Sequence, residues 1–335
     1  MATKTQPPKV SGGEFALIAR HFSRPSVALP SAVVLGVGDD CALLQPTVGH
    51  QLAISSDMLV EGRHFFPGAD PESLGHKALA VNLSDLAAMG ARPLGFTLAL
   101  ALPSVDDTWL AAFARGLFAL ADAHTCPLVG GDTTRGPLNL CITVFGEVLP
   151  GRTLPRNAAQ AGDDLWLSGR TGEARLALAQ RLGEPWAHAI APGDLALAQA
   201  RMDRPTPRLA LGMALAGVAH AALDVSDGLA GDLGHILRAS GLGAEMDWAA
   251  LPLAPALAGL PLAWQQECVL HGGDDYELLV TAAPAARETM QAAAQASGTP
   301  LHRVGRLLAA PGLHLIDAHG QRQPLALRGH DHFSA

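Results

Sequence analysis

Aspartates recur beside glycine or serine in this chain, and they do so in six short segments. The segments are GVGDDC at 36–41, SSD at 55–57, NLSD at 82–85, VGGDTT at 129–134, DVSDG at 224–228 and HGGDDYE at 271–277. The short arm and two oxygens of Asp suit a Mg²⁺ ion held close to backbone, and glycine lets backbone approach a phosphate. Any one segment also fits an ordinary turn, but six together indicate several metal ions and a polyphosphate.

Other chemistries lack their sequence signatures. The chain contains no GxSxG, no Gly-Lys-Ser or Gly-Lys-Thr of a Walker motif, and no GxGxxG of a dinucleotide-binding turn. The 14 histidines are dispersed without HExxH or a close Cys/His spacing, which argues against zinc. We therefore assign no nucleophile and no general base.

Composition narrows the class of protein further. A length of 335 residues suggests about two domains, and a net charge of -8 gives no electrostatic footprint for nucleic acid. The longest apolar stretch, 209–223, is short for a membrane span. The start, residues 1–12, lacks an apolar signal segment and is expected to be a flexible tail. Four scattered cysteines fit a reduced, cytoplasmic protein.

Alternating and helical hydrophobic patterns predict the elements that position these segments. The first half is expected to form strands at 32–37, 51–55, 96–102, 126–130 and 139–148, with helices at 72–89 and 106–123. A turn-rich stretch at 149–163 marks the domain boundary. The second half is expected to form strands at 164–168, 221–225, 244–248, 276–282 and 301–307, with helices from 173 and at 208–219, 229–240 and 284–297. Residues 183–207 look irregular.

This placement predicts how some of the acids point. Alternation along a strand puts Ser55 and Asp57 on one side, and Asp224 and Ser226 likewise. Asp85 stands in an apolar helical pattern, where it either faces inward and needs a partner such as a metal, or marks a helix break. His235 is expected on a helix surface or in packing.

From about residue 13 to 333 the chain resembles the thiamine-monophosphate kinase family. The resemblance rests on EFALIARHF (14–22), GVGDDCALL (36–44), GRHF (62–65), KALAVNLSDLAAMGARP (77–93), GGDTTRG (130–136), DVSDGLAGDLGHI (224–236) and GGDDYEL (272–278). It implies the two-domain α/β (α+β mixed) fold of the aminoimidazole ribonucleotide synthetase superfamily, with mixed sheets and helices packed on them. The expected domains are 13–150, for ATP and Mg²⁺ binding and dimerisation, and 151–335, which completes the active site.

The resemblance also implies an activity. The family transfers the γ-phosphoryl group of ATP to thiamine monophosphate, giving thiamine diphosphate and ADP, the final step of thiamine diphosphate biosynthesis. The acceptor is already an anion, so several Mg²⁺ ions would offset the repulsion between two anions and align them. Transfer would be direct and in line, and the protein would be a homodimer paired through strands of its first domain.

Family positions imply roles for particular residues of this sequence. Metal ligands are implied at Asp40, Ser55, Ser56, Asp57, Asp85, Asp132, Asp224 and Asp227. Nucleotide contacts are implied at Gly131, Asp132, Arg156 and Ser226, and substrate contacts at His64, Asp274 and His330.

Three residues depart from the family pattern. Ser56 replaces a common Thr, Asp274 replaces a frequent Glu, and His330 replaces an aromatic residue, so the expected reach and stacking toward the substrate are reduced. Two other hypotheses stay open. One is an ATP-dependent synthetase or ligase of the same superfamily with another acceptor, and the other is a nucleotide or metal sensor without turnover.

Overall fold

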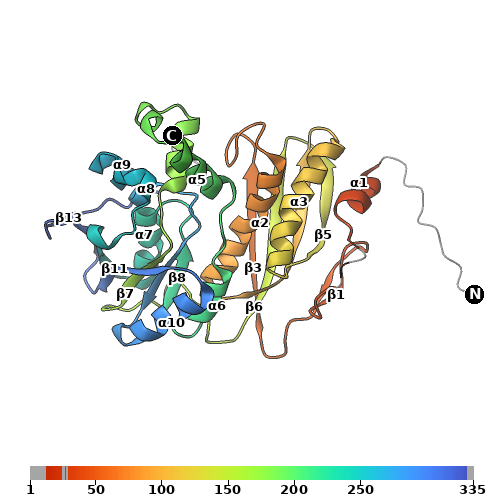
Figure 1. The fold of residues 1–335 in the computed structure, drawn as a ribbon. Coiled ribbons are helices and arrows are strands. Elements are labelled where there is room, and N and C mark those ends of the chain that lie inside the picture. The colour runs from red at the N-terminus through yellow and green to blue at the C-terminus, as the bar shows by residue number, and fades with distance from the viewer. Residues whose placement is uncertain (1–12, 25–26, 28, 330–335) are drawn as a thin grey trace, which may run out of the picture. The chain divides into compact units, whose positions relative to one another are not determined.

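The computed structural model describes residues 13–24, 27 and 29–329, and it is a mixed α/β structure (Figure 1). By backbone contacts the chain divides into two compact units, residues 1–45, 56–79 and 94–144 in one and residues 46–55, 80–93 and 145–335 in the other. Four elements, β3, α2, β4 and β6, contribute residues to both. The domain boundary expected at 149–163 stays a prediction.

The first sheet has four strands in the order β3-β6-β4-β5, with β4 and β5 parallel. A separate two-stranded ribbon pairs β1 with β2. The elements of this half are α1 (Glu14–His21), β1 (Val33–Leu35), β2 (Leu43–Leu44), β3 (Gln51–Val60), α2 (Pro71–Ala88), β4 (Arg92–Leu102), α3 (Asp107–Ala123), β5 (Leu128–Arg135) and β6 (Asn139–Val148).

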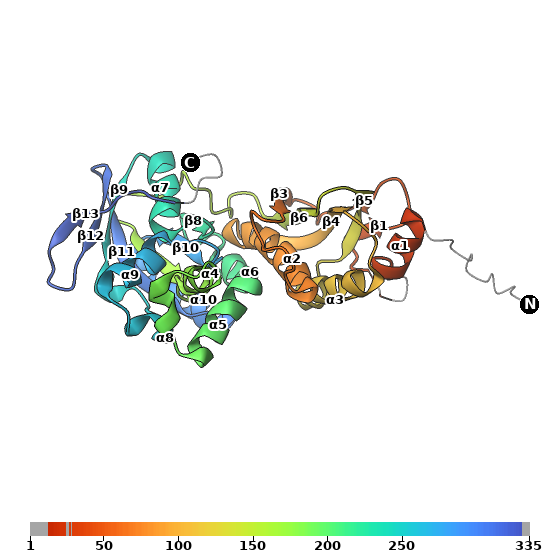
Figure 2. The same ribbon diagram turned by 90° about the horizontal axis from the view of Figure 1, so that it is seen from above.

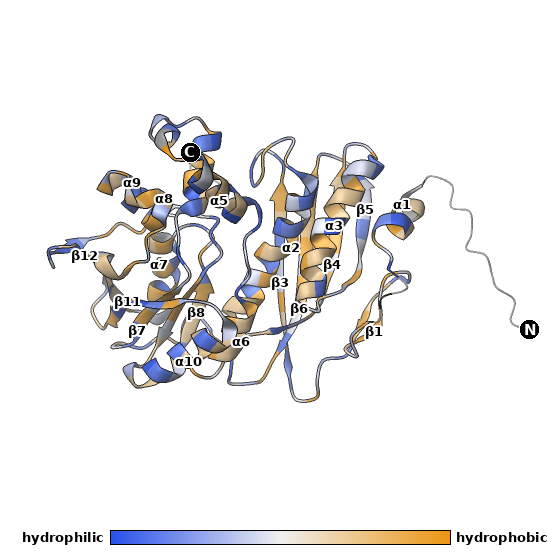
Figure 3. Ribbon diagram, viewed as in Figure 1, coloured by the Kyte–Doolittle hydropathy of each residue, from blue (hydrophilic) through white to orange (hydrophobic). Residues whose placement is uncertain are grey.

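Helices α2 and α3 lie on one face of the four-stranded sheet (Figure 2). They approach closely where each has a glycine, since a Cβ atom at Gly116 would lie 1.8 Å from the Glu72 carbonyl oxygen. Asp106 begins α3 as its N-cap, because its carboxylate accepts hydrogen bonds from the backbone N–H groups of Thr108 and Trp109. The buried residues of α3 are Leu110, Phe113, Ala114, Gly116, Leu117, Leu120 and Ala121. Figure 3 colours this helix by hydropathy, and much of it is hydrophobic.

The second sheet has seven strands in the order β13-β12-β9-β11-β7-β10-β8, all antiparallel except for the β12–β9 pair. The elements are β7 (Asp164–Ser168), α4 (Glu173–Arg181), η1 (Pro185–Ala189), α5 (Pro192–Asp203), α6 (Leu209–Leu215), β8 (Ala221–Asp224), α7 (Leu229–Ser240), β9 (Gly243–Asp247), η2 (Trp248–Ala250), α8 (Pro255–Ala258), α9 (Leu262–Gln266), η3 (Glu267–His271), β10 (Leu278–Ala282), η4 (Pro284–Ala286), α10 (Arg287–Ser297), β11 (Leu301–Leu308), β12 (Gly312–Ile316) and β13 (Arg322–Pro324).

The core of this unit sits between the central strands and α7. Every residue of β7, β8 and β10 is buried, and their apolar residues pack with Leu233 and Ile236 of α7. Such strands read as continuous apolar runs, as expected where both faces of a sheet are covered. The arrangement fixes the position at which β8 ends and the loop toward α7 begins.

Several predicted elements need correction. The strand expected at 51–55 continues to Val60, and that expected at 126–130 runs from Leu128 to Arg135, so SSD and GGD lie inside strands rather than in turns. Residues 183–207, expected to be irregular, contain η1 and α5, and the helix expected at 208–219 ends at Leu215. α5 buries only Ala198 and Met202, so its apolar pattern is weak.

In the described part of the chain, no helix is both long and apolar enough to span a membrane. The apolar stretch at 209–223 does not form one helix, because the structure divides it between α6, a turn and β8.

Candidate active site

Two carboxylates meet inside the second unit. Asp85 lies in the last turn of α2, where it accepts a 2.5 Å hydrogen bond from the Ser55 hydroxyl of β3. Burial raises the pKa of Asp85, and the Ser55 hydrogen bond and the charge of Arg156 offset this only in part. Because α2 runs to Ala88, the helix continues through Ser84 and Asp85, and the alternative of a helix break is wrong.

Asp224 is the last residue of β8 and only 6% exposed. Burial, and then the negative charge of Asp85, raise the pKa of Asp224 to about 7. A buried carboxylate whose pKa is raised by a second, half-buried carboxylate needs either a proton or a cation. The pair thus has the electrostatic character of a cation site.

Without divalent metal, we expect the free energy of unfolding to fall as the pH rises from about 4 to about 7. An unfolded Asp has a pKa of about 4, so across this window the folded chain keeps a proton on Asp224 that the unfolded chain has lost. One such group contributes at most about 1.4 kcal/mol per pH unit. Urea unfolding in EDTA at pH 5 and pH 8 measures the difference, and Asp224→Asn should make it smaller. Equal pH dependence in the two proteins would contradict the assignment.

The loop between β8 and α7 is held by a third acid. Gly228 has φ +119°, and the side chain of Asp232, in the first turn of α7, accepts hydrogen bonds from the N–H groups of Asp227 (3.0 Å) and Gly228 (3.1 Å). Burial raises the pKa of Asp232 to about 7. Sequence reasoning gave Asp232 no role, although an acid in the first helical turn after a Ser-Asp-Gly loop is a recognisable capping signal.

The two acids of Gly272–Glu277 have different environments. Asp274 has φ +73° and donates its backbone N–H to the Ser226 carbonyl oxygen at 2.7 Å. Asp275 is buried, and its carboxylate accepts the Gly172 N–H at 2.7 Å at the start of α4. Burial raises the pKa of Asp275 well above its usual range. Asp275 therefore caps the start of α4.

Arg156 and His235 are both exposed. Arg156 lies close enough for its charge to act on Asp85, and its carbonyl oxygen accepts a hydrogen bond from Ser240. His235 contacts Arg238 on the surface of α7, which confirms its expected place on a helix surface.

The remaining candidates, Asp40, Ser56, Asp57 and His64, belong to the first unit. Ser55 and Asp57 share the half-buried face of β3, while Ser56 is exposed on the other face and bonds Thr143 at 2.9 Å. Asp40 is exposed, and its N–H binds the Asp39 carboxylate as in an ordinary turn. The His64 ring accepts a hydrogen bond from the Val60 N–H at 3.0 Å.

The GGD segment at 130–132 has a structural constraint of its own. Gly131 has φ +146°, and a Cβ atom there would lie 1.9 Å from the Leu98 carbonyl oxygen of β4. Glycine is therefore required by the neighbouring strand, whatever else binds there. Gly131 and Asp132 are both exposed in the described structure, so a ligand can reach them.

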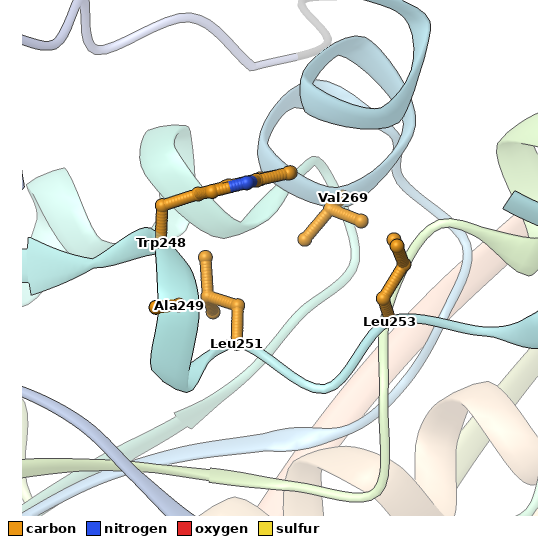
Figure 4. A pocket seen from close by; sticks show the side chains of 5 residues that line it. All are labelled: Trp248, Ala249, Leu251, Leu253 and Val269. Carbon is orange, nitrogen blue, oxygen red and sulfur yellow. The ribbon is translucent and has the colours of Figure 1, made fainter. Parts of the chain in front are cut away.

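Among the described residues, no group of three or more His, Cys, Asp or Glu is arranged to hold a metal ion. His330 lies outside the described residues. A pocket of about 210 Å³ lies elsewhere in the second unit and is lined by Trp248, Ala249, Leu251, Leu253 and Val269 (Figure 4). None of these five residues is charged, so the pocket is unsuited to phosphate.

Comparison with known proteins decides the family. The protein family described as "AIR synthase related protein, N-terminal domain" matches residues 38–148. The family described as the corresponding C-terminal domain matches residues 160–318. The thiamine-monophosphate kinase of Salmonella typhimurium is 44% identical over 334 residues, covering 96% of this chain and 98% of that protein. The chain belongs to the thiamine-monophosphate kinase family.

Solved structures of this family agree with the fold. The thiamine-monophosphate kinase of Stenotrophomonas maltophilia K279a has a TM-score of 0.80 at 46% identity, over 88% of this chain and 93% of that one. AaThiL complexed with AMPPCP and TMP has a TM-score of 0.74 at 28% identity, over 86% and 89%. The expected two-domain, mixed α/β fold is thereby confirmed.

Proposed function

We propose that this chain is a kinase that transfers the γ-phosphoryl group of ATP to thiamine monophosphate, releasing ADP and thiamine diphosphate. The observation that carries the proposal is the buried Asp224 under the charge of the half-buried Asp85, in a chain 44% identical to a thiamine-monophosphate kinase. A relative bound to AMPPCP and TMP supports the same pair of substrates.

A divalent cation, Mg²⁺ in our proposal, fits the second unit because the negative charge of Asp85 raises the pKa of the buried Asp224 there. Oxygen ligands of this type are those that Mg²⁺ prefers. Ser55, Asp85, Asp224 and Asp227 are the residues that would hold it. The expected further ligands, Asp40, Ser56, Asp57 and Asp132, stay predictions from the family pattern. When bound, the cation would neutralise charge on the phosphates.

The chain's own residues would bind and orient the two anions. An oxygen of the acceptor phosphate attacks the γ-phosphorus in line, the bond to the β–γ bridging oxygen breaks, and ADP leaves, with no covalent enzyme intermediate. Arg156 is exposed and its positive charge acts on Asp85, so it is suited to clamp phosphate oxygens. The Asp227 and Gly228 N–H groups are already bonded to Asp232, so their role is to fix the loop.

A homodimer and a cytoplasmic location complete the proposal. Ile54 and Met58, on the outer face of β3, are 59% and 53% exposed, and exposed apolar side chains on a strand are candidates for a subunit contact. The location follows only from the scattered cysteines of the sequence.

A coupled assay tests the function. We expect ADP release only when thiamine monophosphate is present, equimolar thiamine diphosphate as product, and a steep loss of activity when free Mg²⁺ is depleted. Reactions with thiamine or with no acceptor are the controls. ADP release that does not depend on thiamine monophosphate would instead indicate a synthetase with another acceptor, and the absence of turnover with every acceptor would favour a sensor.

A further inference from the structure

The loop that carries Asp274 is held in an unusual backbone conformation. Asp274 and Tyr276 have φ +73° and +52°, in the left-handed region that non-glycine residues seldom occupy. Such a conformation persists only where the surrounding structure imposes it, and it is concentrated at functional sites. The contacts that impose it here therefore bear on function.

Backbone hydrogen bonds join this loop to the end of β8. The Asp274 N–H donates to the Ser226 carbonyl oxygen at 2.7 Å, and the Tyr276 N–H donates to that of Val225 at 2.8 Å. In return the Val225 N–H donates to the Glu277 carbonyl oxygen at 2.7 Å. The three bonds fall directly after Asp224, so a shift of Glu277 must also shift that residue.

The side chain of Glu277 is held by three other side chains. It is 0% exposed, and it accepts hydrogen bonds from Arg201 (2.6 Å), Arg208 (2.7 and 2.5 Å) and Ser168 (2.5 Å). The Ser168 hydroxyl in turn accepts the Leu278 N–H at 2.8 Å. Donors from β7, from the last turn of α5 and from the residue before α6 thus converge on one carboxylate.

We propose that Glu277 is a positioning residue that sets the backbone around Asp224 and Asp274, with Arg201 and Arg208 as its anchors. The inference rests on the proposed function and extends it. The guanidinium groups of Arg201 and Arg208 hold the Glu277 carboxylate in the core. The three backbone hydrogen bonds then fix the positions of Asp224 and Asp274 relative to Glu277. Residues of this kind, behind the groups that bind metal or substrate, typically change activity by about 10- to 100-fold when altered.

A matched control exists on the same sheet. Asp164, at the other end of β7, is 3% exposed and is bonded by Arg287 at 2.5 and 2.8 Å. It is therefore also a buried carboxylate with a bidentate arginine. Its strand partners are Ala282 of β10 and Arg306 of β11, and neither belongs to the loop that carries Asp274. A purely structural role for buried ion pairs predicts the same outcome at both sites.

The experiment compares Glu277→Gln, Arg208→Lys and Asp164→Asn with the unaltered protein, below the melting temperature of each. We expect Glu277→Gln to lower kcat by about 10- to 100-fold, Arg208→Lys to lower it by less because the charge is kept, and Asp164→Asn to leave it within twofold. Hydrogen exchange should quicken at the amides of Val225, Asp274 and Tyr276 in the first two variants only. If Glu277→Gln does not fold, Arg208→Lys alone decides.

The results separate the two proposals. If the unaltered protein is active but Glu277→Gln and Asp164→Asn lose activity equally, and the three amides exchange alike in both, the positioning role is wrong. If the unaltered protein does not phosphorylate thiamine monophosphate, the proposed function fails, and hydrogen exchange still tests whether Glu277 holds the loop.

Discussion

Replacing Asp224 by asparagine is expected to lower kcat by at least about 100-fold, the effect of losing one electrostatic stabiliser of a transition state. The same change should raise the melting temperature of the metal-free protein at pH 8. Asp224 is buried beside Asp85, and burial and the Asp85 charge both disfavour its ionised form. A neutral amide of nearly the same shape removes that repulsion. Activity and stability should therefore change in opposite directions, as is common at functional sites.

Steady-state assays with ATP and thiamine monophosphate, and thermal unfolding in EDTA, measure the two effects. Glu288→Gln is a suitable control, because Glu288 is an exposed acid in the first turn of α10. It should change neither quantity appreciably. If Asp224→Asn kept near-normal turnover, the acid pair would have no catalytic part. If it lost turnover together with stability, the loss would reflect folding instead of charge.

The sequence predicts elements well where local signals agree. Strand β7 and helix α7 have the predicted bounds, 164–168 and 229–240, because an apolar run or a helical stripe there is bounded by glycine. The prediction failed for β3, since Ser55, Ser56 and Asp57 interrupt the apolar pattern while the strand continues. Polar residues within a strand look like a strand end when the sequence alone is considered.

In the candidate site, too, local sequence signals predicted some features and not others. The position of Asp85 inside a helix and its partial burial followed from its apolar neighbours, and the structure agrees. The roles of Asp275 and Glu277 did not follow, because each depends on partners that the local pattern does not reveal. Glu277 is bonded to Ser168, 109 residues earlier in the chain, and Asp275 to Gly172, 103 residues earlier. Long-range pairing of this kind is a property of the fold and leaves no spacing to read.

Asp57→Asn is the second change expected to reduce kcat by at least about 100-fold. Asp57 lies in the interior of β3, where it shares the half-buried face with Ser55, the residue that donates to Asp85. A residue within a paired strand is held more rigidly than one in a turn, so its carboxylate is well placed to keep a fixed geometry. Loss of the charge should therefore reduce turnover while the strand, whose backbone is unchanged, stays folded.

The matched control for this change is Asp106→Asn. Asp106 caps α3 through hydrogen bonds to Thr108 and Trp109, and asparagine is a comparably good N-cap, so both activity and stability should stay near those of the unaltered protein. Measurements of kcat at saturating ATP and thiamine monophosphate, with circular dichroism to verify folding, compare the two variants. Near-normal turnover in Asp57→Asn would remove this residue from the proposed ligands. A loss of turnover in both variants would mean that the first unit is sensitive to any change of acid to amide, and the result could not then be credited to the charge of Asp57.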